Sequence, residues 1–70
     1  MIDWQQLTIA IRQHYKPLER VADELGISRQ HINRLARGDV AEPRFNSGVK
    51  LLDLAYDVLP PDQFERVRIE

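Results

Sequence analysis

The stretch SRQHINRLAR, residues 28–37, carries polar side chains whose types and spacing suit molecular recognition. On a helix they lie on the side opposite Ile32 and Leu35, and they are Ser28, Arg29, Gln30, Asn33, Arg34 and Arg37. Arginine can donate two parallel hydrogen bonds to O6 and N7 of guanine, and glutamine or asparagine can pair with N6 and N7 of adenine. These six residues are therefore candidates for reading base edges in a major groove.

The order of the candidates along the helix divides them into two groups. A recognition helix points its N-terminal residues at the bases, so we expect direct readout from Arg29, Gln30 and Asn33. Arg34 and Arg37 lie further along and can reach either bases or phosphates. The alternative interpretation of this face is a solvated polar surface that binds nothing.

A second helix and a turn must hold this face in place, and residues 18–37 have the pattern for both. Small Ala22 allows two helices to cross closely, and Gly26 suits the positive φ that often follows a helix end. Apolar or small residues occupy the positions that a helix-turn-helix buries: Leu18, Val21, Ala22, Leu25, Ile27, Ile32 and Leu35.

This pattern predicts one helix over residues 18–25 and a recognition helix from about 29 to 36. Ser28 is a natural N-cap for the second helix, and Gly38 is expected to end it. The alternative is an ordinary helical hairpin with no role in nucleic-acid binding.

A first helix is predicted from residue 3 to about residue 14. Asp3 is expected to cap it, with Gln6 at the spacing of a capping box. Trp4 falls on the apolar face, where a core position is favoured over a platform for stacking bases. The helix should close before Pro17, a residue that is tolerated in the first turn of the next helix.

Residues 39–45, DVAEPRF, are expected to form a connecting loop. Asn46 or Ser47 then caps a fourth helix that reaches about Leu59. The apolar residues of this segment follow the helical period: Leu51, Leu52, Ala55, Val58 and Leu59.

The proline pair at residues 60–61 stops the fourth helix, and the tail after it has two interpretations. Asp62 can cap a short fifth helix that carries Phe64 and Val67, which we favour. Alternatively, residues 67–69 can form a strand that pairs with the same strand of a second copy.

Composition places the 70 residues in one small domain, residues 1–70, with 43% hydrophobic and 30% charged side chains. The chain has no cysteine, which excludes a disulfide framework and a thiolate metal site. It has no apolar run long enough to span a bilayer, and its first residues lack the order of a signal peptide. We expect a cytoplasmic protein of a bacterial host cell, associated with the nucleoid.

Catalysis is not expected from these residues. His14 and His31 lie on different predicted helices without a companion acid or nucleophile, and the carboxylates match no metal loop. The chain is therefore predicted not to be an enzyme, with no cofactor, no metal, no small-molecule ligand and no membrane partner.

Charge is distributed unevenly around the net value of −1. Residues 12–37 contain six Lys or Arg and three Asp or Glu, whereas the rest of the chain has four basic and eight acidic residues. A positive region that coincides with the predicted recognition helix is what a DNA-facing surface needs. Candidates for contacts to the DNA backbone are Lys16, Leu18, Arg20, Arg44, Asn46 and Ser47.

The segment GISRQHINRLARG, residues 26–38, resembles the phage Cro and CI repressor family, whose fold is the lambda-repressor-like, XRE-type helix-turn-helix. The resemblance extends over residues 2 to about 59. It implies an all-α fold, a compact bundle of four or five helices. It also implies that the loop EPRF, residues 42–45, touches the DNA backbone near a dimer contact that includes Arg44 and Phe45.

Two features depart from the family pattern. Leu18 stands where relatives often have a glutamine that holds a phosphate, so only its backbone N–H can do so here. The loop DVAE, residues 39–42, is acidic where relatives tend to be basic.

The expected function is that of a sequence-specific DNA-binding transcriptional regulator, a Cro-type phage or prophage repressor. Such a protein binds a near-palindromic operator in double-stranded DNA as a homodimer. The alternative is a module with the same fold that binds a host or phage protein instead of DNA.

Overall fold

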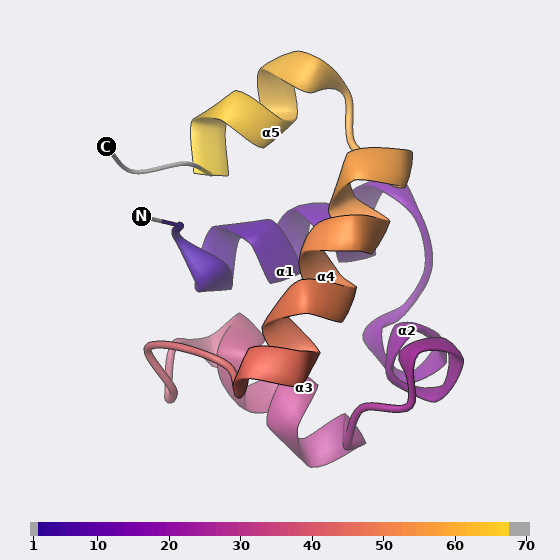
Figure 1. Ribbon diagram of the computed structural model, residues 1–70, viewed down its shortest axis with the longest axis vertical. Coiled ribbons are helices and arrows are strands. Elements are labelled where there is room, and N and C mark those ends of the chain that lie inside the picture. Colours follow the sequence, from indigo (N-terminus) through magenta and orange to yellow (C-terminus); the bar gives the residue numbers. More distant parts are fainter. Residues whose placement is uncertain (1, 68–70) are drawn as a thin grey trace.

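Helix α1 is the element against which the other four helices pack in the computed structural model (Figure 1). The structure describes residues 2–67, and these are all-helical, as predicted. The helices in chain order are α1 (Trp4–His14), α2 (Leu18–Leu25), α3 (Arg29–Arg37), α4 (Phe45–Val58) and α5 (Pro61–Val67).

The central place of α1 follows from its spacing of apolar residues. Leu7 and Ile11, four residues apart, lie on one face and are completely buried. Trp4, on the same face, is partly buried against the core, which confirms its predicted position. Thr8 is also fully buried, and its hydroxyl is satisfied by donating a 2.7 Å hydrogen bond to the carbonyl oxygen of Trp4.

The connection between α2 and α3 forms as the sequence indicates. Gly26 has φ +71°, and the N–H of Ile27 donates to the carbonyl oxygen of Ala22 at 2.9 Å. Ser28 caps α3 by accepting a hydrogen bond from the N–H of His31 at 3.3 Å. Helix α3 continues to Arg37, one residue beyond the predicted end.

Helix α4 begins earlier than predicted. Phe45 is its first residue rather than the end of a loop, and neither Asn46 nor Ser47 is the cap. Arg44 occupies the N-cap position without a side-chain hydrogen bond, because a guanidinium group has no acceptor for a backbone N–H. The N–H of Gly48 donates to the carbonyl oxygen of Arg44 at 2.8 Å and closes the first turn.

Gly48 is buried in this first turn for a steric reason. A Cβ there would lie 3.3 Å from the ring of Trp4 and 3.3 Å from the ring of Pro43. The close approach of Trp4 therefore needs a glycine, and it fixes the start of α4 against the start of α1.

The prolines at the starts of α2 and α5 take other positions than predicted. Pro17 is the N-cap of α2 rather than part of its first turn. Pro61 is the first residue of α5, so Asp62 lies inside the helix and does not cap it. Proline has no N–H, so it suits the first helical position, where that group would have no partner.

Helix α5 returns the chain to its beginning. The N–H of Asp3 donates to the carbonyl oxygen of Val67 at 2.7 Å, and Figure 1 shows α5 ending beside the start of α1. The rings of Tyr56 and Phe64 stack with centroids 4.5 Å apart and join α4 to α5. The helical interpretation of the tail is thus confirmed up to Val67, while the rest of the alternative strand, residues 68 and 69, lies outside the described residues.

None of the helices between residues 2 and 67 combines the length and the apolar character needed to cross a bilayer.

Replacing Gly26 with alanine tests the turn between α2 and α3. The nearest atom to an added Cβ is Nζ of Lys50 at 3.8 Å, so the substitution creates no clash. The positive φ alone should then destabilise the fold by about 1 kcal/mol. Gly26→Asn should cost less, because asparagine tolerates this conformation. Urea unfolding of both variants measures the difference, and equal stability of wild type and Gly26→Ala would contradict the argument.

Candidate nucleic-acid interface

The polar residues of α3 are exposed because its apolar residues point into the core. Ile32 and Leu35 are 0% exposed, which fixes the rotation of the helix about its axis. Every residue predicted to read bases lies on the exposed surface: Ser28, Arg29, Gln30, Asn33, Arg34 and Arg37. The structure therefore brings this set together along one helix.

The C-terminal end of α3 is held by a residue that the sequence analysis did not single out. Nε2 of Gln5, on α1, donates a 3.3 Å hydrogen bond to the carbonyl oxygen of Ala36. Gly38 follows with φ +80°, and a Cβ there would lie 3.0 Å from the same Nε2 atom. The positive φ favours glycine at this position, and the Gln5 amide lies beside its Cα.

At the other end of α3, Arg29 forms an ion pair across to α2. Its Nε donates to Oδ1 of Asp23 at 3.0 Å, and its Nη2 donates to Oδ2 at 2.5 Å. The hydrogen bonds from Arg29 lower the pKa of the Asp23 carboxyl below its usual value. Arg37 is paired in a similar way, with 3.2 Å between its Nε and Oδ2 of Asp39.

The middle of the exposed face is free of such partners. Within residues 2–67, the side chains of Gln30, Asn33 and Arg34 take part in no hydrogen bond or ion pair. Their donors and acceptors are available to a ligand without breaking a contact inside the protein.

An open hollow of about 640 Å³ lies beside this face, between α3 and the junction of α1 with α2. Arg29 and Asn33 line it from α3, and Arg12 and Lys16 line it from the side of α1. Arg12 was not among the predicted contacts, because its approach to α3 depends on how the two helices pack. Leu18 also lines the hollow, but its side chain is buried, which leaves only its backbone N–H for a phosphate.

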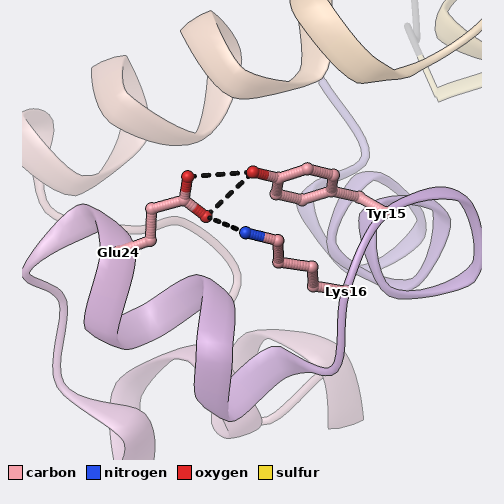
Figure 2. A network of polar contacts seen from close by, with 3 residues as sticks. All are labelled: Tyr15, Lys16 and Glu24. Atoms are coloured by element: carbon pink, nitrogen blue, oxygen red, sulfur yellow. Dashed lines mark hydrogen bonds and ion pairs between the residues drawn. The ribbon is translucent and has the colours of Figure 1, made fainter.

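Lys16, a predicted contact to the DNA backbone, takes part in a network with Tyr15 and Glu24 (Figure 2). Its Nζ lies 3.4 Å from Oε2 of Glu24, on α2, and 4.8 Å from the centre of the Tyr15 ring. The Tyr15 hydroxyl donates to the same carboxylate, at 2.8 Å to Oε1 and 2.9 Å to Oε2. Part of the positive charge of Lys16 is therefore balanced within the protein.

This network shifts the pKa of two groups in directions that stabilise their charges. Tyr15 first, and Glu24 next, raise the pKa of Lys16. The Tyr15 hydroxyl is the main cause that lowers the pKa of Glu24, and Lys16 adds to it. The network joins the end of α1 to the last turn of α2, and these are the two helices against which α3 packs.

The other residues predicted to contact the DNA backbone lie in different places on the surface. Arg44 and Ser47 line a polar hollow of about 320 Å³ together with Arg34, whereas Asn46 does not line it. His31 lies at the same hollow, and its Nε2 is buried without a hydrogen-bond partner among the described residues. Arg20, in the first turn of α2, lines a different hollow together with Asp23 and Arg29.

Phe45 lines a second, apolar hollow and not this polar one. It is 82% exposed at the edge of a space of about 370 Å³ that Arg44 also lines. Apolar residues from two parts of the chain complete the space: Ile2, Trp4, Pro43, Val49 and Leu52. The two residues predicted for a dimer contact thus border one exposed apolar surface.

No protein-family model, curated protein or solved structure matches the chain. In the described part of the chain, no three His, Asp or Glu side chains gather as metal ligands. The polar face of α3 and the hollows beside it are therefore the features on which a functional conclusion rests.

Replacing Tyr15 with phenylalanine tests the network at the junction of α1 and α2. Loss of the hydroxyl should raise the pKa of Glu24 toward its ordinary value near 4.5. A lowered pKa in the folded state contributes stability that is present above the unfolded-state pKa and is lost as pH falls through the folded-state pKa. The variant should therefore lose less stability than wild type on acidification below about pH 4.5.

The pKa of Glu24 is measured by NMR titration of its carboxyl carbon, and the loss of stability by urea unfolding across the same pH range. Tyr56→Phe is the matched control, because that hydroxyl lies on α4 and should leave Glu24 unchanged. An identical pKa of Glu24 in wild type and Tyr15→Phe would rule out the assigned cause.

Proposed function

We propose that this chain is a sequence-specific DNA-binding regulator of the Cro type, with α2 and α3 as its helix-turn-helix and α3 as its recognition helix. One observation carries the proposal. Helix α3 buries Ile32 and Leu35 completely and leaves a row of five polar side chains on the outside, three of them arginines: Arg29, Gln30, Asn33, Arg34 and Arg37.

The surroundings of α3 suit the phosphate backbone on both sides of a groove. Arg12 and the backbone N–H of Leu18 lie at one hollow beside the helix. Arg44 and Ser47 lie with Arg34 at the other. Cations and amide groups that flank a recognition helix fix its orientation on the duplex, while the helix itself reads bases.

A dimer of this chain would recognise the two half-sites of an operator. Phe45 and Val49 are exposed by 82% and 42% on the apolar surface at the start of α4, and a second copy covering this surface would remove both from water. A two-fold dimer places two recognition helices about 34 Å apart, in successive major grooves of a near-palindromic site. A bound dimer represses transcription by blocking the polymerase.

Selection of binding sites from a random duplex pool tests this function. The wild-type chain should select a near-palindromic consensus. Arg29→Ala and Gln30→Ala should each relax the choice at one base pair in each half-site and weaken binding by about 1–3 kcal/mol, because each removes a bidentate contact.

Arg66→Ala is the matched control for charge, since Arg66 is exposed on α5 and Figure 1 shows α5 at the end of the molecule opposite α3. It should leave the consensus unchanged. Wild-type protein that selects no duplex even at low salt would overturn the proposal. Unchanged selectivity in both α3 variants would overturn the assignment of these residues to base readout.

Phe45→Ser tests the dimer contact. Removing this exposed aromatic side chain from the apolar surface should raise the dimer dissociation constant at least about tenfold, as truncation of an interface aromatic commonly does. Sedimentation equilibrium measures the constant. Lys50→Ser on the same helix is the control and should have little effect, because Lys50 is exposed and does not line this apolar surface. A wild-type chain that stays monomeric at millimolar concentration would contradict the contact.

A second candidate function is a module that binds a host or phage protein. Its support is the exposed surface of α4, where Tyr56 is 73% exposed and its neighbours Asp53 and Asp57 are exposed as well. An aromatic side chain among acidic groups suits a basic protein surface. Failure of the selection experiment would favour this function over the first.

A further inference from the structure

The ion pair between Asp23 and Arg29 uses only one edge of the arginine. A guanidinium group has two forked edges: a side-on edge made by Nε and Nη2, and an end-on edge made by Nη1 and the second N–H of Nη2. The carboxylate of Asp23 accepts from Nε at 3.0 Å and from Nη2 at 2.5 Å, so it occupies the side-on edge. Within residues 2–67 the end-on edge has no partner.

The ion pair between Asp23 and Arg29 contributes little to the stability of the fold. Both side chains remain 58% exposed, and an ion pair between exposed side chains contributes little to stability because water screens the charges. What the pair does supply is order: a long side chain held at two atoms has fewer conformations to lose when it binds. Arg29 is the first residue of α3, the position from which a recognition helix reaches the bases.

We propose that Asp23 is a positioning residue, which holds Arg29 by its side-on edge so that the end-on edge faces O6 and N7 of a guanine. This inference rests on the proposed function. Because the two edges are separate, Arg29 can keep Asp23 and bind guanine at the same time. Asp23 therefore sets which base Arg29 reads without touching the DNA itself.

The charge of Asp23 adds to the discrimination. Its carboxylate lies at an open hollow of about 430 Å³ with Arg20 and Glu19, on the side of α2 that adjoins α3. Phosphates repel this carboxylate on every duplex, whereas the guanine contact of Arg29 is gained only on the right one. Asp23 thus weakens non-specific binding while it supports specific binding.

Asp23→Asn tests the inference, with Glu19→Gln as the matched control. Both variants remove one negative charge from exposed positions of α2, but Glu19 acts on Arg29 only through its nearby charge. Affinities are measured for the selected operator and for a scrambled duplex at two salt concentrations. Both variants should bind the scrambled duplex more tightly. Only Asp23→Asn should lower the ratio of specific to non-specific affinity, by about tenfold.

Three further readouts separate positioning from a general effect on the fold. Site selection with Asp23→Asn should relax the same base pair that Arg29→Ala relaxes. The double variant should bind no worse than Arg29→Ala alone, because the two residues act through one contact. Thermal unfolding of Asp23→Asn should match that of wild type within a few degrees.

The possible failures are distinguishable. If Arg29→Ala loses discrimination and Asp23→Asn keeps it, the positioning role is overturned and the proposed function stands. If Asp23→Asn binds the operator more tightly and keeps its consensus, Asp23 is a competitor that holds Arg29 away, which also overturns the inference. If wild type selects no duplex, both the function and the inference fall.

Discussion

The burial of Ile32 and Leu35 is the contact on which the rest of the structure depends. Helix α3 has nine residues and a mainly polar sequence, and isolated helices of this length are marginal in water. Packing against α1 and α2 must therefore supply most of its stability. Because Ile32 and Leu35 both point into the core, the polar side chains on the other side of the helix are exposed to solvent. The contact that stabilises the helix is thus the same one that exposes the candidate interface.

Helix α1 makes that contact rigid at several points. Gln5 holds the last turn of α3, and Tyr15 with Lys16 holds Glu24 near the end of α2. Each of these contacts is made by a polar group and ties together two different helices or their ends. A recognition surface needs such restraint, since side chains on a fixed helix lose less entropy when they bind than side chains on a mobile one.

Local signals in the sequence account for most of the helices, and the errors arise where a capping signal is lacking or a contact is long-range. Ser28, Gly26 and Gly38 act within one turn of their own helix, so α2 was predicted to the residue and α3 to within one residue of its end. The predicted start of α4 is too late, because its N-cap, Arg44, makes no side-chain hydrogen bond and so leaves no capping signal in the sequence. Arg12 was missed because its neighbours in space are on another helix.

The sequence by itself determined which residues of α3 face inward and which face outward, because a period of 3.6 and two apolar side chains leave one rotation of the helix. Only the tertiary structure decided which exposed charges are free. It pairs Arg29 with Asp23 and Lys16 with Glu24, and leaves Gln30, Asn33 and Arg34 without partners in the part of the chain it describes. Ion pairs between helices form only where the packed helices bring two groups within about 4 Å of each other, a distance that spacing along the chain does not encode.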